Sequence, residues 1–246
     1  MIDDLCRFLG NKDSRCSYNK DANMNFYLEY GTAIKETLDQ LAWQEVQKVV
    51  TVLHQAWLAK SQVFIMGNGG SAATASHIAC DLGKNTAVEN LPRLRVMALN
   101  DNMAWFSAHA NDNGYENVFA EQLCNFVRER DVVIAISASG NSANVLKAVE
   151  KARLLGAFTI GWSGYAGGKL AQIVDISVIV PNHCIEQIED IHLMLGHIVT
   201  TELRQLMRDF ASANATVAPV LPASDLDSNT EPHTEPHDVY VMQAAD

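Results

Sequence analysis

Apolar and polar residues follow one another along the chain in blocks that predict strands separated by helices. From Met24 to Lys60, apolar residues recur at spacings near three and four, which is typical of helix. Five short apolar runs without internal charges follow, and each predicts a buried strand. They are VFIMG (63–67), RVMALN (95–100), DVVIAISAS (131–139), FTIGWSG (158–164) and ISVIVP (176–181).

Helical patterns connect these runs. They cover 71–85, 115–129, 142–156 and 167–174, and a long one extends from about 185 to 211. Strands that alternate with helices predict a parallel sheet covered on both faces. We therefore expect an α/β three-layer sandwich with a five-stranded parallel sheet, on which the N-terminal helix packs.

The two ends of the chain have a different composition. Residues 1–23 are polar and mixed and predict a loose arm, whereas 24–210 predict a single domain. The segment 211–246 is acidic and rich in Pro, Ser and Thr, which is typical of disorder. Its TEPHTEPH repeat contains His233 and His237. We expect a solvated tail there, with metal capture as the alternative.

Composition limits the class of partner. The formal net charge of -11 argues against nucleic acid or an anionic membrane as the main partner, because both require clustered Lys and Arg. The 5 cysteines are widely spaced without a CxxC pair, which favours free thiols in the cytosol. The acidic N-terminus does not resemble a signal peptide, and no run reaches the roughly 18 apolar residues of a membrane span.

Two loops rich in glycine and serine follow the first and third predicted strands. GNGGS spans Gly67–Ser71, SASGNS spans Ser137–Ser142, and each opens a helix. Glycines let backbone N–H groups approach an anion, and a helix N-terminus attracts negative charge. Neither loop has the GK[ST] of a nucleoside-triphosphate site, so these neutral donors suit a phosphate monoester. The alternative is two ordinary turns with capping serines.

Imidazoles and carboxylates form a second candidate site. His77 and Asp81 lie four residues apart and share one helix face. Glu189, His192 and His197 lie on the last predicted helix. Glu189 and His197 are separated by about 12 Å of helix rise and would hardly reach one atom from the same helix. The set favours acid–base chemistry or a metal, with a packed imidazole as the alternative for each histidine.

Three stretches together resemble the sugar isomerase (SIS) domain and, more narrowly, the phosphoheptose isomerases. They are GNGGSAATASH, ISASGNSANVLKAVEKAR and IEQIEDIHLMLGH, and the resemblance extends from about Met24 to Met207. It implies the SIS fold and a homotetramer with active sites between subunits. It also implies interconversion of sedoheptulose 7-phosphate and D-glycero-D-manno-heptose 7-phosphate, without a nucleotide cofactor.

The resemblance also implies roles for single residues. It implies substrate binding by the two loops, at Asn68, Gly69, Gly70, Ser71, Ser137, Ala138, Ser139 and Ser142, and at Asp101 and Glu189. The family's catalytic glutamate and histidine match Asp81 and His197. The zinc ligands of some members match His77, Asp81, Glu189 and His197.

Two departures from the family leave alternatives open. Asp81 replaces a glutamate, and a base shortened by one methylene loses reach. Glu189 replaces a glutamine, so it either strengthens a zinc site, with Glu189 or His197 supplied across a subunit boundary, or acts as the base itself. The third possibility is a metal-free site in which Glu189 forms a salt bridge with a basic side chain, such as Arg204 or Lys84 of a neighbour. The alternative functions are a non-catalytic regulator that binds a replication initiator protein, and a sugar-phosphate sensor.

Overall fold

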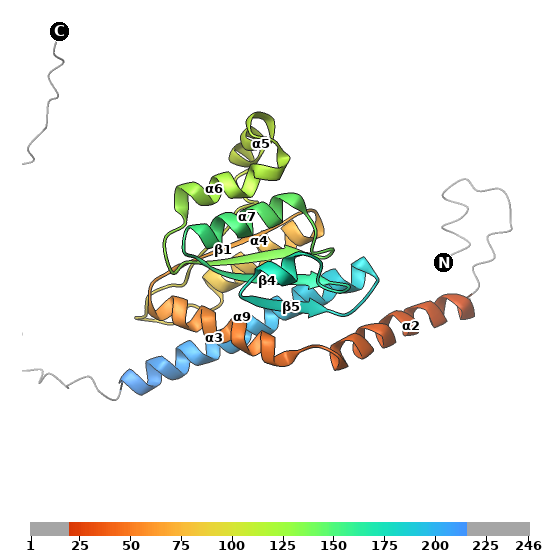
Figure 1. Cartoon of the computed structure of the whole chain (residues 1–246). Coiled ribbons are helices and arrows are strands. Elements are labelled where there is room, and N and C mark those ends of the chain that lie inside the picture. The colour runs from red at the N-terminus through yellow and green to blue at the C-terminus, as the bar shows by residue number, and fades with distance from the viewer. Residues whose placement is uncertain (1–19, 216–246) are drawn as a thin grey trace, which may run out of the picture.

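The computed structural model describes residues 20–215, and a central parallel sheet organises them (Figure 1). Its order is β2-β1-β3-β4-β5, and all neighbouring strands are parallel. The predicted α/β fold with a five-stranded parallel sheet is therefore confirmed. The strands are β1 (Gln62–Gly67), β2 (Arg95–Ala98), β3 (Val132–Ser137), β4 (Phe158–Gly164) and β5 (Ile176–Val180).

Helices cover both faces of the sheet. One face is covered by α3 (Trp43–Leu58), α4 (Gly70–Lys84) and α9 (Ile185–Ala215). The other is covered by α6 (Val118–Phe126), α7 (Ala143–Leu154) and α8 (Leu170–Ile173). Side chains alternate along a strand. In β1, Val63 and Ile65 therefore join the first core, whereas Phe64 and Met66 join the second.

The N-terminal helical pattern is not one helix, contrary to the prediction. It divides into α2 (Lys20–Asp39) and α3, with a turn between them. In this turn the buried Leu41 enters the core, and its carbonyl accepts the Trp43 N–H at 2.9 Å. α3 packs along the sheet. α2 contacts the core only near its end, through Ile34 and Leu38, and its N-terminal part projects from the body (Figure 1). Met24, Phe26, Tyr27 and Leu28 of α2 are all more than half exposed.

A further difference lies between β2 and β3. No element was predicted for 101–114, where the structure has α5 (Met103–Asp112), and the predicted helix 115–129 divides into η1 (Tyr115–Asn117) and α6. None of the residues of α5 is buried, so its sequence lacks the apolar face that reveals a helix. The Asn102 side chain begins α5 by accepting the Trp105 N–H at 3.1 Å.

The expected arm and tail lie largely outside the described residues, as do His233 and His237. α2 already begins at Lys20, and α9 continues to Ala215, past the expected helix end at 211. Within residues 20–215, none of the helices combines the length and apolar character that crossing a membrane requires. The cysteines of this part, Cys80, Cys124 and Cys184, are free thiols.

Candidate functional site

The strand order places the two glycine- and serine-rich loops at one crevice. From β1 the chain moves outward to β2 and then returns to the other side of β1 to form β3. The loops that follow β1 and β3 therefore diverge, and such a point at the carboxyl ends of parallel strands is where ligands bind in doubly wound sheets. The two predicted loops, Gly67–Ser71 and Ser137–Ser142, occupy these two places.

The two loops enclose a cavity of about 140 Å³, which we call the serine cavity. Helix α4 begins with the first loop and α7 directly after the second. The first N–H groups of a helix have no acceptor within it, so both helices direct positive potential toward the cavity. The cavity is lined by Asn68, Ser71, Ile136, Ser137, Ala138, Ser139, Ser142, Ile185 and Glu189.

The serines of the cavity do not act as helix caps. Ser142 occupies the N-cap position of α7, but its side chain makes no capping hydrogen bond. Its Oγ lies instead 3.2 Å from Oγ of Ser137. One hydroxyl of this pair donates to the other, so at least one O–H is available to a ligand. Ser71 lies inside α4, beyond its N-cap Gly69. The capping interpretation of these serines is therefore not supported.

Glu189 of α9 lies against the start of α4. A Cβ atom at Gly70 would collide with the Glu189 carboxylate, so the absence of a side chain at Gly70 allows this approach. Burial raises the pKa of Glu189, and the negative charges of Glu186 and Asp190 raise it further. Within residues 20–215 no ion pair involves Glu189. A carboxylate with a raised pKa beside a cavity is suited to accept a proton from a ligand.

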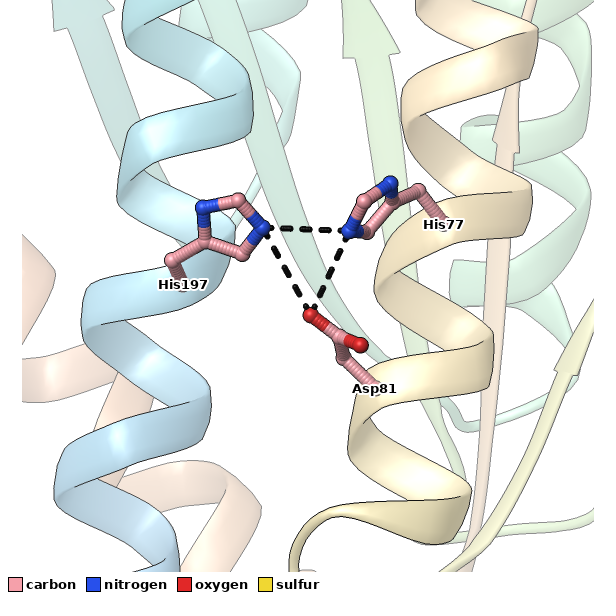
Figure 2. Close-up of side chains that lie close together, drawn as sticks. All are labelled: His77, Asp81 and His197. Carbon is pink, nitrogen blue, oxygen red and sulfur yellow. Dashed lines mark hydrogen bonds and ion pairs between the residues drawn. The ribbon is translucent and has the colours of Figure 1, made fainter.

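A second group of side chains, the histidine cluster, consists of His77, Asp81 and His197. Figure 2 shows His77 and Asp81 of α4 and His197 of α9 pointing toward one another. Nε2 of His77 lies 3.0 Å from Nε2 of His197. Oδ2 of Asp81 lies 3.4 Å from the first nitrogen and 3.6 Å from the second. Both imidazoles are about half exposed, at 47% and 50%, so the cluster is open at the surface.

Close packing of α4 and α9 brings the cluster together. Gly196 of α9 lies against Ile78 of α4, and a Cβ at position 196 would collide with the Ile78 side chain. Gly196 directly precedes His197, and Ile78 directly follows His77. Close approach of the two helices at Gly196 and Ile78 therefore also brings His197 to His77. Asp81 lies one helical turn after His77 and joins it on the same face.

The cluster fits a divalent metal. The three ligand atoms all lie within 4.8 Å of one another. Zn–N and Zn–O bonds of about 2.0–2.1 Å in tetrahedral geometry separate the ligand atoms by about 3.3 Å. The distances of 3.0, 3.4 and 3.6 Å are close to this value. The second carboxylate oxygen of Asp81 accepts a 2.8 Å hydrogen bond from Asn85, which orients Oδ2 toward the imidazoles.

Two of the predicted site residues are not members of the histidine cluster. Glu189 is at the serine cavity and is not a member of the cluster in this chain. Its separation from His197 along α9 is the physical reason, as expected from the helix rise. Asp101 is exposed, accepts a hydrogen bond from Ser76 Oγ at 2.5 Å, and lines a neighbouring cavity with Met103 and Trp105.

His192 belongs to neither site, which corrects its inclusion among the candidates. It lies on the face of α9 that Ile188 and Leu195 also direct into the core, and it is completely buried. Its Nε2 lies 3.2 Å from the Ser163 carbonyl oxygen. Burial lowers the pKa of His192 to about 4, although the bond to Ser163 opposes this shift. His192 is thus the packed imidazole that was the alternative for each histidine.

Sequence reasoning missed the polar residues that support the cavity. Asn144 of α7 and Tyr115 of η1 both contact the side chain of Asn68. Asn100 after β2 donates to the Gly67 carbonyl at 2.7 Å and so holds the end of β1. Asn144 lies within the GNSAN stretch, where it could have been noticed, whereas no pattern marks Tyr115 or Asn100.

The serine cavity and the histidine cluster lie along the same pair of helices. Glu189 faces Gly70 at one end, and His197 faces His77 farther along, so α4 and α9 run side by side in the same direction. From Ser71 to His77, α4 rises by about 9 Å. A ligand held in the cavity at one end can therefore reach the cluster only if it is elongated.

Comparisons with known proteins agree with this geometry. The SIS domain family matches residues 26–164 of the chain. The phosphoheptose isomerase of Rhodospirillum rubrum is 43% identical over 141 residues, which cover 57% of this chain and 74% of that protein. The phosphoheptose isomerase of Helicobacter pylori strain P12 is 37% identical over 173 residues, which cover 70% of this chain and 89% of that protein.

A solved structure extends the similarity to α9. The phosphoheptose isomerase of Neisseria gonorrhoeae superimposes with a TM-score of 0.69 at 28% identity, and the match covers 76% of this chain and 98% of that one. A match of this extent includes almost the whole of the related fold. The chain therefore belongs to the SIS domain proteins and, among them, to the phosphoheptose isomerase family.

Proposed function

We propose that this protein isomerises a phosphorylated heptose, converting sedoheptulose 7-phosphate into D-glycero-D-manno-heptose 7-phosphate. The placement of the serine cavity and the histidine cluster along α4 and α9 carries this proposal. An extended seven-carbon chain spans about 8 Å, because each C–C bond advances it by about 1.3 Å. This length matches the helix rise of about 9 Å between Ser71 and His77.

The serine cavity holds the phosphate. Hydroxyls of Ser71, Ser137, Ser139 and Ser142 and the N–H groups at the start of α4 donate to its oxygens. Gly69, Gly70 and Ala138 contribute backbone rather than side chains. Asn68 donates from the cavity wall, and Asp101 contacts the sugar from beyond β2. Anchoring the distant phosphate places the reacting carbons at a fixed position, which lowers the entropic part of the barrier.

The histidine cluster provides acid–base chemistry. A carboxylate, either Asp81 or the Glu189 of a second copy of the chain, removes the proton from the carbon next to the carbonyl, and a cis-enediol forms. His197 donates a proton to the carbonyl oxygen and removes one from the neighbouring hydroxyl. Return of the first proton to the adjacent carbon completes the exchange of aldose and ketose. His77, 3.0 Å from His197, sets the orientation of the His197 ring.

Zinc is the proposed metal of the cluster. His77, Asp81 and His197 would hold it, because their ligand atoms have the required chemistry and spacing. When bound, zinc polarises the carbonyl and hydroxyl oxygens of the substrate. A second copy of the chain would supply Glu189 as a fourth ligand. Glu189→Gln distinguishes the two roles of this residue: lower turnover with zinc retained identifies Glu189 as the base, and loss of zinc identifies it as a ligand.

A homotetramer in the cytosol completes the proposal. The exposed apolar residues of α2, Met24, Phe26, Tyr27 and Leu28, support association between copies. The groove along α9 that borders His197, lined by Met194, Ile198 and Thr201 among others, supports active sites between subunits. Light scattering at micromolar concentration tests the assembly, and a monomer would contradict it. Free thiols support a reducing compartment.

Turnover of sedoheptulose 7-phosphate tests the function. We expect NMR to detect formation of the aldose with the purified protein, and His197→Gln to slow it strongly. A sugar-phosphate sensor would bind the compound without forming product, and a replication regulator would give no product either. Neither alternative is favoured. A sensor or a regulator does not require an acid–base pair, whereas here Nε2 of His197 lies 3.6 Å from Oδ2 of Asp81.

A further inference from the structure

The side chain of Asn68, in the wall of the serine cavity, is held by three hydrogen bonds to other side chains. Its Nδ2 donates to Oδ1 of Asn144 at 2.8 Å, and its Oδ1 accepts from Nδ2 of Asn144 at 2.9 Å. The Tyr115 hydroxyl donates to the same Oδ1 at 2.9 Å. Asn144 is buried, with 2% of its surface exposed, so water does not compete for this reciprocal pair.

A backbone group determines the orientation of both amides. The Val145 N–H donates to Oδ1 of Asn144 at 3.0 Å, so this atom is an oxygen and the other terminal atom of Asn144 is the amide nitrogen. That nitrogen must donate to Asn68, so the Asn68 atom facing it is the oxygen. The Nδ2 of Asn68 is therefore fixed as well. It carries two hydrogens, of which Asn144 accepts one.

Tyr115 connects this amide pair to a separate part of the fold. It belongs to η1, and its ring packs against Phe106 of α5 with the ring centres 5.8 Å apart. Phe106 in turn packs against the buried Phe119 of α6 at 5.7 Å. These ring contacts anchor Tyr115, although half of its surface is exposed, and its hydroxyl reaches Asn68.

We infer that Tyr115 and Asn144 are positioning residues, which fix Asn68 so that its remaining N–H donates to an oxygen of the bound sugar phosphate. Both acceptor sites of the Asn68 oxygen are already used by Asn144 and Tyr115. Asn68 thus presents only a donor to the cavity. A phosphate or carbonyl oxygen satisfies this donor, whereas an ammonium or amide N–H in the same place is disfavoured. The inference rests on the proposed function for the identity of the ligand.

Tyr115→Phe tests the inference with the least disturbance. It removes the hydroxyl and keeps the ring against Phe106. In the proposed role, Asn68 contacts the substrate equally in the ground state and in the transition state. Loss of the Tyr115 hydroxyl, which supports Asn68, should therefore weaken the binding of both states equally. We expect KM for sedoheptulose 7-phosphate to rise about 2- to 10-fold with kcat unchanged, which corresponds to one neutral hydrogen bond. The melting temperature should stay that of the wild type.

Tyr165→Phe is the matched control, because Tyr165 is also an exposed tyrosine whose ring packs on a neighbour, His183. It should leave KM unchanged. An unchanged KM in Tyr115→Phe would overturn the inference. A lower kcat at constant KM would also overturn it, since this pattern indicates a smaller folded fraction or a direct catalytic role.

Asn144→Asp provides a second test at the same pair. Aspartate keeps an acceptor for Val145 and for Asn68 but removes the donor that orients the Asn68 oxygen. We expect KM to rise by more than in Tyr115→Phe, and an unchanged KM in a folded variant would contradict the inference. If the wild type shows no turnover, the proposed function fails. The same variants are then compared by calorimetry with sedoheptulose 7-phosphate, where equal Kd values would overturn the positioning role.

Discussion

The serine cavity and the histidine cluster are built in different ways, although α4 and α9 contribute to both. The cavity lies where two loops leave adjacent strands, and Ser71 and Ser137 are 5% and 4% exposed. The cluster lies on the outer faces of two helices, where both imidazoles are half exposed. One site is enclosed by the backbone of a single chain, and the other is open to solvent or to a second chain.

This difference separates binding from chemistry. The cavity needs only the local geometry of two strand-to-helix turns, so its donors are in place before a ligand arrives. The cluster depends on contact between helices that are more than a hundred residues apart in the sequence, and it borders the groove of α9. We therefore expect changes in the cavity to alter affinity and changes in the cluster to alter turnover.

The largest effect is expected in the cavity. Combining Ser137→Ala with Ser139→Ala removes two hydroxyl donors to a charged phosphate. Each loss destabilises the complex by about 1.5–3 kcal/mol, so together they weaken binding by about 3–6 kcal/mol if the two are additive. Calorimetry with sedoheptulose 7-phosphate measures the change. Ser107→Ala on the exposed surface of α5 is the control. Affinity equal to that of the wild type would place the phosphate elsewhere.

The second effect concerns the cluster alone. His197→Gln removes the proton-transferring imidazole, and we expect kcat to fall roughly 10²- to 10⁴-fold. The dissociation constant of the substrate should change little, because His197 does not line the serine cavity. Product formation followed over time by NMR gives kcat, and calorimetry gives the dissociation constant. If His197→Gln weakened binding as strongly as the serine changes, the proposed division between binding and chemistry would be wrong.

The fold was predictable because its central strands, β1, β3 and β4, are buried on both faces. Runs such as FTIGWSG contain no charge, and the structure gives β4 the predicted limits, Phe158–Gly164. Predictions failed where helices lack a buried face or where a helical pattern continues across a turn. α5 has no buried residue, and Leu41 continues the apolar spacing of α2 and α3 although the chain turns there.

From residue spacing alone, the candidate site was predictable only where its residues are close in sequence, and it was the resemblance to the phosphoheptose isomerases that grouped His197 with His77 and Asp81. The two loops and the pair His77 and Asp81 follow from local spacing. Which residues of α9 reach them depends on how α9 packs, and sequence spacing alone could not place His197 at the cluster and His192 in the core. The support of Asn68 by Tyr115 joins residues 47 positions apart and leaves no periodic signal.

The third prediction tests whether zinc binds at the histidine cluster and thereby stabilises the folded protein. Zinc that binds only the folded protein stabilises it by about 2.7 kcal/mol at a concentration 100 times its dissociation constant. We expect added zinc to raise the melting temperature of the wild type and a chelator to lower it. His77→Gln should abolish the response, whereas His183→Gln, at an exposed histidine outside the cluster, should not. A wild type without bound zinc by elemental analysis, and without a thermal response, would exclude the metal.

The smallest effect concerns His192, which is buried in α9 between the residue at the cavity, Glu189, and the residue at the cluster, His197. Burial lowers the pKa of His192 to about 4, below the ordinary value of 6.5. Between these two values the unfolded chain binds a proton that the folded chain does not. Stability is therefore complete above pH 6.5 and falls as the pH decreases toward 4.

At pH 5 this single group should lower the free energy of unfolding by roughly 2 kcal/mol relative to pH 7. His192→Leu removes the titrating ring and should flatten this part of the pH dependence, measured by urea unfolding between pH 4.5 and 7 at about half-unit steps. The exposed His183, changed to Gln, controls for the loss of a histidine. Since α9 serves both sites, acid should weaken phosphate affinity and turnover together in the wild type. An unchanged pH dependence in His192→Leu would assign the acid sensitivity to other groups.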